Sequence, residues 1–410
     1  MRAPSSLAHL AAPSKRLRLW INLIGLGLAS LLLATIALNL GPPTDDSRQY
    51  RQGARNVLTY GDPYATTFIN DWSTPPYPNP PLLAYLLVPT VPLGEAGGRT
   101  LWFGLNLMAL VALVVISLRI VELPRLKAYW GLLSLVVVLA PPVYLCLLYG
   151  QLGIMLTLLL VAGFACAERR PALAGALLAF AAAIKIYPAL VGGFYLLRGP
   201  RRVVWWAAGF GLLLLAFPIL FHGLQPYQSY GERVLFSGFY PYAAEFNVSL
   251  MGLARRLFTV SGTRFSPVAE LPLLASLLTL LGSLAVVALC VRSSFTPGRL
   301  GAQLSFSMWL CATLLLSPIN GYYNLAGLIF PLFVLIRALY DNPERHLIGI
   351  TALATALLAL PPGWYRFSDS FDAAIRQGWT MMVLVPPLFG LILYLVVLDR
   401  LAARLRRAQE

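Results

Sequence analysis

The chain has 410 residues, of which 58% are apolar and only 11% are charged, and its mean hydropathy is +0.72. These values exclude an ordinary soluble globule, in which about a quarter of the residues are charged, and they predict a polytopic membrane protein. The formal net charge of +15 favours basic loops on the cytoplasmic side of membrane spans. A nucleic-acid partner would need a continuous basic stripe. The basic residues are instead dispersed between apolar segments, so we expect no nucleic acid.

The first apolar segment covers residues 19–40 and follows three basic residues, Lys15, Arg16 and Arg18. Its 22 residues carry no charge and exceed the roughly 20 that a helix needs to cross a bilayer. A secretory signal peptide would have a shorter apolar core and a small-residue cleavage site. We therefore predict a retained signal anchor, with residues 1–18 as a basic cytoplasmic N-terminus.

The later spans follow in chain order when every basic loop is placed in the cytoplasm. This choice leaves both termini inside, with residues 400–410 as a basic tail, and it predicts a multi-pass membrane protein. The expected spans are residues 100–121, 130–148, 152–167, 203–221, 271–291, 302–316, 322–339, 346–360 and 379–398.

Residues 171–197 lie between two basic loops, so this segment has to cross outward and return. It is too short for two full spans. Pro188 disfavours helix at Tyr187 and removes a backbone donor. We therefore predict two short helices that meet near Lys185, a kind of break that occurs where protein or a wet cavity surrounds it.

The expected outer loops collect the tyrosines, tryptophans, asparagines and most of the acids. They are residues 41–98, 222–270 and 361–378, with short turns at 149–151 and 317–323. Residues 80–93 form an apolar run that is short for a span, and we predict a re-entrant or interfacial helix there. A crossing would invert several later loops. Acceptor selectivity is expected in the loops 222–270 and 361–378.

Several kinds of site lack sequence support. Three scattered histidines and four cysteines without paired spacing predict no metal, no cofactor and no disulfide. The sequence contains no phosphate-binding loop, no dinucleotide fingerprint and no Gly-x-Ser-x-Gly elbow. We interpret the cysteines, which fall inside predicted spans, as small core residues: Cys146, Cys166, Cys290 and Cys311.

Two adjacent acids, Asp45 and Asp46, lie near the start of the first outer loop. On a helix that begins just after Pro43, Asp46 and Tyr50 are four residues apart and share one face, from which both can point into a cavity. Either acid can instead cap that helix, where a carboxylate complements the N-terminal dipole. Both interpretations stay open at this point.

Four cations on the outer side also have two interpretations. Arg48, Arg51 and Arg55 oppose the positive-inside trend and either contact lipid headgroups or hold a phosphate through their planar forks of donors. Lys185 lies within an apolar segment, where an ammonium is costly and is by default a functional hypothesis. It either neutralises a lipid phosphate or extends to the membrane surface.

Seven motifs follow one another along the chain: Asp46-Ser47-Arg48-Gln49-Tyr50, Tyr60-Gly61-Asp62-Pro63-Tyr64, Tyr77-Pro78-Asn79-Pro80-Pro81-Leu82, Tyr149-Gly150-Gln151, Ala174-Gly175 with Ala183-Ile184-Lys185-Ile186-Tyr187-Pro188, Asn247-Val248-Ser249-Leu250, and Leu316-Ser317-Pro318-Ile319. Their order resembles glycosyltransferase family 87, bacterial membrane enzymes of the GT-C fold that include mannosyltransferases using polyprenyl-phosphate mannose. The Lys-Ile-Tyr-Pro stretch is also similar to part of the glycosylphosphatidylinositol mannosyltransferases. The resemblance runs over about residues 19–340. It implies one all-α GT-C domain over residues 1–410, with about 11–12 transmembrane segments including short broken helices.

The resemblance also implies an inverting transfer of a sugar, with mannose as the first choice. The donor would be a polyprenyl-phosphate sugar and the acceptor a lipid-linked or cell-envelope molecule at the extracytoplasmic face. The Asp-x-x-x-Tyr pattern assigns the general base to Asp46, with Asp45 as the alternative. The leaving phosphate needs cations, and the candidates are Lys185, Arg48, Arg51, Arg255 and Arg256. The candidates for substrate binding are Tyr50, Tyr64, Gln151, Tyr187, Asn247, Ser249, Asn320 and Tyr323.

One segment departs from the family pattern. After the Ser-Pro motif many members carry an aromatic residue and a histidine, whereas this chain continues Ile319-Asn320-Gly321-Tyr322-Tyr323-Asn324. Asn320 or Tyr323 would take over contacts to sugar or phosphate, although neither is cationic at neutral pH. The sequence around Asn247 also fits an N-glycosylation sequon, and we interpret it as the family's Asn-x-Ser-Leu element.

Two other functions remain open from sequence alone. A carrier or flippase for a lipid-linked sugar would be expected to have internal repeats and midplane polar residues in both halves, whereas the polar residues here concentrate on one face. A non-catalytic assembly subunit is the third hypothesis.

Overall fold

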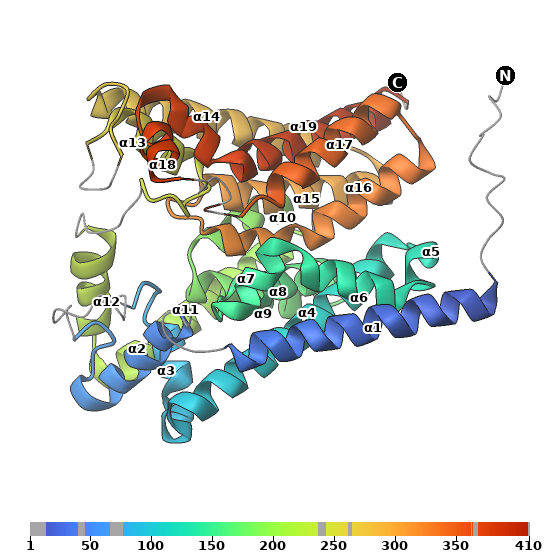
Figure 1. Cartoon of the computed structure of the whole chain (residues 1–410). Coiled ribbons are helices and arrows are strands. Elements are labelled where there is room, and N and C mark those ends of the chain that lie inside the picture. The colour runs from blue at the N-terminus through green and yellow to red at the C-terminus, as the bar shows by residue number, and fades with distance from the viewer. Residues whose placement is uncertain are drawn as a thin grey trace.

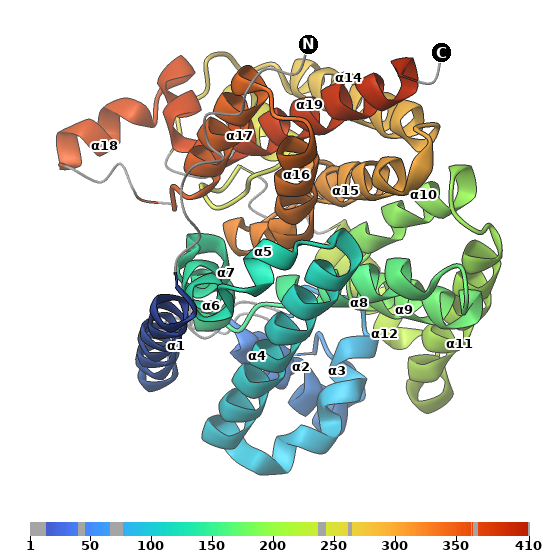
Figure 2. The same cartoon turned by 90° about the vertical axis from the view of Figure 1, so that its right-hand side faces the viewer.

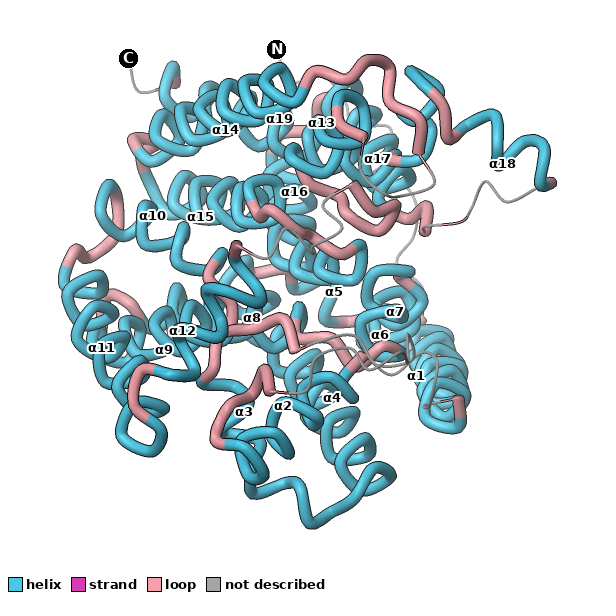
Figure 3. The backbone as a smooth tube through the Cα atoms, turned by 90° about the vertical axis from the view of Figure 1, so that its left-hand side faces the viewer, coloured by secondary structure: helices cyan, strands magenta, loops and turns pink. Residues whose placement is uncertain are grey.

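The computed structural model describes residues 14–39, 46–65, 77–236, 243–260, 265–361, 363 and 368–408. Asp45 lies outside these described residues. The described chain forms helices joined by loops, together with two isolated β-bridges, Asn247–Gly321 and Ser266–Gln377 (Figure 3). A helix satisfies its own backbone hydrogen bonds, which is the requirement that a bilayer imposes.

Within the described residues, six helical segments are long and apolar enough to cross a membrane. The first is α1, and most side chains on α1, α11 and α14 are exposed, as expected for helices that face lipid. These segments confirm the predicted all-α polytopic membrane fold. They are α1 (Lys15–Leu38), α3 (Leu82–Leu87) with η1 (Val88–Leu93) and α4 (Gly94–Val121), α11 (Arg202–His222), α14 (Pro272–Ser294), α15 (Gly298–Leu316), and η4 (Tyr322–Leu328) with α16 (Ile329–Asp341).

Two further apolar segments are bent, where the sequence predicted straight spans over 130–148 and 379–398. The segment of α6 (Trp130–Leu139) and α7 (Pro141–Leu148) bends by 71°, and the segment of η5 (Gly378–Leu384) and α19 (Pro386–Arg407) bends by 69°. In both cases a pair of prolines starts the second helix. Proline lacks an N–H and suits the first helical turn, so each pair ends one helix and begins the next.

The predicted break near Lys185 is confirmed. Helix α9 (Pro171–Ile184) ends at Lys185, whose backbone is extended (φ −141°, ψ 138°), and η2 (Tyr187–Val191) and α10 (Gly192–Leu197) follow. Two more short apolar helices are α8 (Gly153–Cys166) and α17 (Arg345–Leu358).

The remaining helices lie at the two ends of the molecule. Helix α5 is at the end where α1 begins and α19 ends, whereas α2, α12, α13 and α18 are at the opposite end (Figure 1). Their bounds are α2 (Ser47–Tyr60), α5 (Pro124–Lys127), α12 (Gln225–Tyr230), η3 (Gly231–Leu235), α13 (Leu250–Phe258) and α18 (Asp369–Ile375). We call the end that carries α2 the α2 end.

The helices form two layers, one from α1 to α11 and one from α13 to α19 (Figures 1 and 2). A continuous apolar core joins the layers. Small residues allow close approach between α8 and η4: a Cβ on Gly153 would lie 3.1 Å from Cα of Asn324, and a Cβ on Gly327 would lie 2.6 Å from Oγ1 of Thr157. The residues 317–324 are thereby held against the start of α8.

Helix α1 is built into the first layer through its contact with α6. A Cβ on Gly131 would lie 1.9 Å from the carbonyl oxygen of Asn22. The Asn22 side chain donates to the carbonyl of Ala128 at 2.9 Å and accepts from the N–H of Gly131 at 3.0 Å. A buried asparagine thus satisfies both ends of its amide between two otherwise apolar helices.

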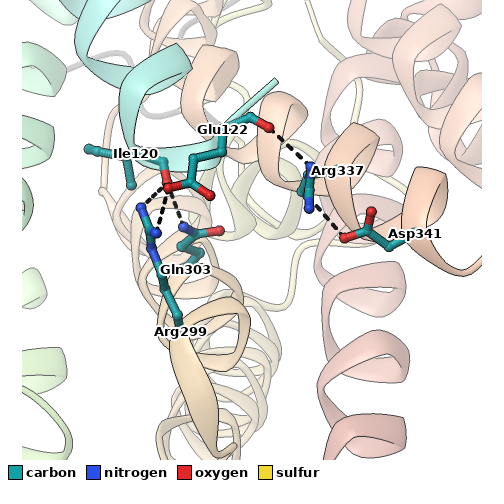
Figure 4. Close-up of polar contacts among 6 residues, drawn as sticks. All are labelled: Ile120, Glu122, Arg299, Gln303, Arg337 and Asp341. Carbon is teal, nitrogen blue, oxygen red and sulfur yellow. Dashed lines mark hydrogen bonds and ion pairs between the residues drawn. The ribbon is translucent and has the colours of Figure 1, made fainter. Parts of the chain in front are cut away.

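At the end opposite α2, basic side chains close the C-terminus of α4 (Figure 4). Glu122 follows α4 in the left-handed region (φ 58°). Arg337 donates to its carbonyl at 3.0 Å, and Arg299 contacts its carboxylate at 2.7 Å. Arg299 and Gln303 both donate to the carbonyl of Ile120, at 3.0 and 2.8 Å. Basic residues here stabilise the negative end of a helix.

Candidate active site at the α2 end

Asp46 lies immediately before α2 and faces the turn of residues 149–151. Its side chain makes no capping hydrogen bond to the first turn of α2. Its Oδ2 instead accepts a hydrogen bond of 2.8 Å from Nε2 of Gln151. The side chain is half-buried. Asp46 therefore occupies the N-cap position without a side-chain capping bond, and its carboxylate faces Gln151. Capping by Asp45 lies outside the described residues.

Tyr50 lies one turn further along the same face of α2. Its hydroxyl donates to Oε1 of Gln151 at 3.0 Å, and its ring centroid is 5.5 Å from that of Trp102 in α4. Burial raises the pKa of Tyr50 well above its usual value, and Tyr323 and Asp46 add to this shift. The phenol therefore stays protonated and acts as a donor. The four-residue spacing brings Asp46 and Tyr50 to the same partner, Gln151.

The turn at residues 149–151 packs directly on the start of α2. Gly150 has φ 63°, and a Cβ there would lie 2.9 Å from Cβ and 3.0 Å from Oγ of Ser47. Nε1 of Trp102 donates to the Gly150 carbonyl at 2.6 Å. Only glycine meets both demands at this position, a positive φ and a bare Cα. This requirement explains the glycine in the Tyr149-Gly150-Gln151 motif.

Lys185 brings the opposite charge to the same region from the break between α9 and η2. Its ammonium interacts electrostatically with the Asp46 carboxylate and lies near the thiol of Cys146. The side chain is half-buried. A carboxylate and an ammonium thus act across one site from segments about 140 positions apart in the sequence, an interaction that partial burial strengthens.

Three tyrosines line the region around these charges. The rings of Tyr149 and Tyr323 meet edge to face with centroids 6.3 Å apart, and both hydroxyls lie in the field of the Asp46 carboxylate. Burial raises the pKa of Tyr149, and Asp46 adds to the shift. Tyr187 borders a cavity of about 10 Å³ with Thr157 and Thr313, which is about the size of one water molecule. The tyrosines are therefore available as hydrogen-bond donors.

The Tyr64 side chain is buried. Its hydroxyl donates to the carbonyl of Asn79 at 2.6 Å. The neighbouring Asp62 accepts from the N–H of Tyr64 at 3.0 Å and from the hydroxyl of Ser229 at 2.7 Å. These contacts join the first outer segment to α12. The predicted contact between Tyr64 and substrate stays a prediction, and the contacts observed here are structural.

Asn247, Ser249 and Asn320 lie together and hydrogen-bond to backbone groups of residues 247–252 and 318–320. Oδ1 of Asn247 accepts from the N–H of Asn320 at 2.9 Å, and its Nδ2 donates to the carbonyl of Pro318 at 2.9 Å. Ser249 accepts from the N–H of Gly252 at 3.0 Å and so caps α13. All three side chains are buried. They fix the segment that carries Tyr323 relative to the start of α13, while their predicted substrate contacts stay untested.

The predicted phosphate-binding arginines have different surroundings. Arg51 contacts Glu95 at 3.0 Å and Ser47 at 2.7 Å. Arg256 is buried and donates to the carbonyls of Gly252 at 3.1 Å and Asn247 at 2.7 Å. These two guanidiniums hold the fold. Arg48 and Arg255 are half-buried, and Lys185 interacts electrostatically with Asp46.

Three residues of the site were not predicted from the sequence, because none of them belongs to a recognised motif. Trp102 and Asn106 belong to α4, and the Asn106 amide, in the orientation that satisfies both ends, donates to the Gln151 carbonyl at 3.0 Å. The Cys146 thiol donates to the same carbonyl at 3.5 Å. An asparagine inside a predicted span was the one available signal, because buried amides need partners. The cysteine is buried, as expected, and also forms part of the site's wall.

A second small apolar core joins the two predicted acceptor loops at the α2 end. The N–H of Ser266 donates to the carbonyl of Arg376 at 3.0 Å, and the N–H of Gly378 donates to the carbonyl of Ser266 at 2.9 Å. The buried Arg376 makes a forked pair with Asp372 at 2.9 Å and also pairs with Glu245. We call this unit, α13, residues 265–271, α18 and η5, the outer cap.

The arrangement of these groups suits proton transfer and charge stabilisation. A half-buried carboxylate accepts a proton from a nearby hydroxyl, and an ammonium beside it stabilises a developing anion. Within the described part of the chain, the acids, histidines and cysteines form no group of three that would hold a metal ion.

Comparison with known proteins gave one match. The model of the family described as glycosyltransferase family 87 matches residues 77–318. This range contains the turn at 149–151, the break at Lys185 and the segment around Asn247, whereas α2 precedes it. No curated protein and no solved structure matched the chain.

Proposed function

Because the chain belongs to glycosyltransferase family 87, we propose that it transfers one sugar, with mannose as the first choice, from a polyprenyl-phosphate donor to a lipid-linked or cell-envelope acceptor. Family membership and the membrane-spanning helices support a membrane glycosyltransferase. The donor, the acceptor and the residue roles given below are parts of the proposal.

The observation that carries the proposal is the pair of opposite charges at the α2 end. Asp46 would accept the proton of the acceptor hydroxyl while that oxygen attacks the anomeric carbon. The bond from the anomeric carbon to the phosphate oxygen breaks in the same displacement, its electron pair leaves with the polyprenyl phosphate, and the anomeric configuration inverts. Proton transfer of this kind contributes roughly 100- to 10,000-fold.

Lys185 is the proposed cation for the leaving phosphate. Its electrostatic interaction with Asp46, which carries the opposite charge, supports this role. A cation aimed at charge that develops in the transition state is worth more in a partly desolvated site than in water. Arg48, on the same helix as Tyr50, is the second candidate.

The outer cap is the proposed acceptor side. It brings together two loops whose nearest ends, residues 270 and 361, are 91 positions apart in the sequence, and it joins them through the ion pair between Arg376 and Glu245. Trp379 is exposed on it, and an indole, which has a polar N–H on an apolar ring, suits the membrane–water boundary, where a lipid-linked acceptor would arrive.

The proposed topology is a single integral domain with both termini in the cytoplasm and the site outside. The start of α1 and the end of α19 lie at one end of the molecule, opposite α2 (Figure 1). The basic residues that close α4 are at that same end, and the positive-inside rule assigns such an end to the cytoplasm.

The test is transfer of radiolabelled mannose from synthetic polyprenyl-phosphate mannose to lipids of bacterial membranes that contain the full chain. We expect Asp46→Asn to lower transfer by roughly 100- to 10,000-fold. Asp341→Asn, which removes an exposed acid paired with Arg337 at the opposite end (Figure 4), is the matched control and should retain activity. Full activity of Asp46→Asn with loss in Asp45→Asn would assign the base to the neighbouring residue. No transfer by the wild type with any polyprenyl-phosphate sugar would refute the donor class.

A further inference from the structure

The Gln151 side chain is held at both ends directly beside Asp46. Its Nε2 donates to Oδ2 of Asp46 at 2.8 Å, and its Oε1 accepts from the Tyr50 hydroxyl at 3.0 Å. Gln151 is 2% exposed and Tyr50 is 1% exposed, whereas Asp46 is half-buried. Two side chains with so little accessible surface are poorly placed to bind substrate, although the carboxylate that they support is accessible.

The ionised Asp46 carboxylate sets which end of the amide faces it, and the Tyr50 hydroxyl holds the other end. A hydroxyl both donates and accepts, and an amide has a donor end and an acceptor end. If the amide were reversed, its oxygen would face the ionised Asp46 at hydrogen-bond distance and two acceptors would repel. The observed orientation therefore accompanies the ionised carboxylate, and reversal becomes favourable only when Asp46 takes up a proton.

The backbone of the turn is fixed as well as the side chain. Trp102 donates to the Gly150 carbonyl at 2.6 Å, and the N–H of Gln151 donates to the carbonyl of Cys146 at 2.9 Å. The Asn106 amide donates to the Gln151 carbonyl at 3.0 Å. A residue whose own position is set by neighbouring hydrogen bonds can orient a reacting group within a few tenths of an ångström, which catalysis requires.

We propose that Gln151 is a positioning residue that keeps Asp46 ionised and oriented toward the acceptor hydroxyl, with Tyr50 holding the other end of the amide. The inference rests on the proposed function, in which Asp46 is the general base. In this proposal Tyr50 and Gln151 do not contact substrate, in contrast to the prediction from the sequence, and they act on it only by positioning Asp46.

The test is the pH dependence of mannose transfer by the full chain, with polyprenyl-phosphate mannose as the probe. The base works when deprotonated, so activity falls as pH decreases through the acidic limb of the profile. Gln151→Leu removes a donor that stabilises the ionised carboxylate, and we expect the limb to move up by about one to two pH units. Tyr50→Phe removes the hydroxyl that holds the other end of the amide, so Gln151 is held less firmly beside Asp46, and it should cause a smaller shift in the same direction.

A second readout separates positioning from substrate binding. Both variants should lower kcat with little change in KM for the donor, because neither side chain touches substrate in the proposal. Gln303→Leu is the matched control: Gln303 is 4% exposed and donates to a backbone carbonyl at 2.8 Å at the opposite end of the molecule (Figure 4). It should lower stability and leave the pH profile in place.

Three outcomes would overturn the inference. The first is a raised KM with an unmoved acidic limb in Gln151→Leu, which would make Gln151 a substrate ligand. The second is an equal shift in Gln303→Leu, which would make the effect a general loss of stability. The third is an unmoved limb in Tyr50→Phe, which also decides the case if Gln151→Leu fails to fold. Absence of transfer by the wild type with any polyprenyl-phosphate sugar would refute the proposed function itself, whereas the three outcomes above are measured on an active enzyme, so the two failures are distinguishable.

Discussion

Gly150→Ala is the sharpest test of how the site is assembled. The substitution places a methyl group on a residue with φ 63°, at 2.9 Å from Cβ of Ser47, 3.0 Å from its Oγ and 3.1 Å from Cδ1 of Trp102. None of these atoms is the free end of a long side chain. Either α2 or the turn has to move, and the hydrogen bond between Gln151 and Asp46 moves with it.

The loss of folding stability expected for Gly150→Ala has two parts. A side chain in the left-handed region costs about 1–2 kcal/mol, and overpacking a closely packed contact costs about 1–3 kcal/mol more. Gly298→Ala is the control for the first part, because Gly298 has φ 76° and open space around its Cα. We therefore expect Gly150→Ala to cost about 2–5 kcal/mol and Gly298→Ala only about 1–2 kcal/mol.

The assay compares the two variants by thermal unfolding in detergent and by mannose transfer at a temperature where both are folded. Gly150→Ala should unfold at a lower temperature than Gly298→Ala and lose about 100-fold in activity, the scale expected when a catalytic group moves by about 1 Å. Equal unfolding temperatures together with near wild-type transfer would refute the reasoning. In that case the contact between the turn and α2 would not position Asp46.

Two further substitutions test other parts of the structure. Lys185→Met should lower transfer by about 100- to 1,000-fold because the leaving phosphate loses its cation. The control is Lys127→Met, which changes an exposed lysine and should leave transfer unchanged. Retained transfer in Lys185→Met would remove Lys185 from the mechanism. Gly131→Ala places a Cβ 1.9 Å from the carbonyl of Asn22 and should reduce the yield of folded protein, measured by size-exclusion chromatography, whereas Gly27→Ala has open space and should not. Equal yields would mean that α1 packs elsewhere.

The residues of the site differ in how far the sequence could identify them. Asp46 and Tyr50 were predicted to share a face because helical spacing is a local property, and both contact Gln151. Gln151 was predicted as a substrate ligand, although its hydrogen bond to Asp46 joins positions 105 residues apart. Tyr64 and Arg256 were predicted from motif and charge, and only the structure revealed that each is buried among backbone carbonyls.

The sequence by itself determined that the chain lies in a membrane, where most of its helices are, and that a helix breaks near Lys185. Composition is a property of the whole chain, and the length of an apolar run and the position of a proline act locally. These features can therefore be read from the sequence without knowing which distant segments pack together. The tertiary structure decided which polar groups meet. The pairing of Gln151 with Asp46, the approach of Lys185 to that carboxylate, and the joining of two distant loops in the outer cap all depend on contacts between segments far apart in the sequence. Such contacts depend on how the helices pack, and local sequence patterns do not predict that packing.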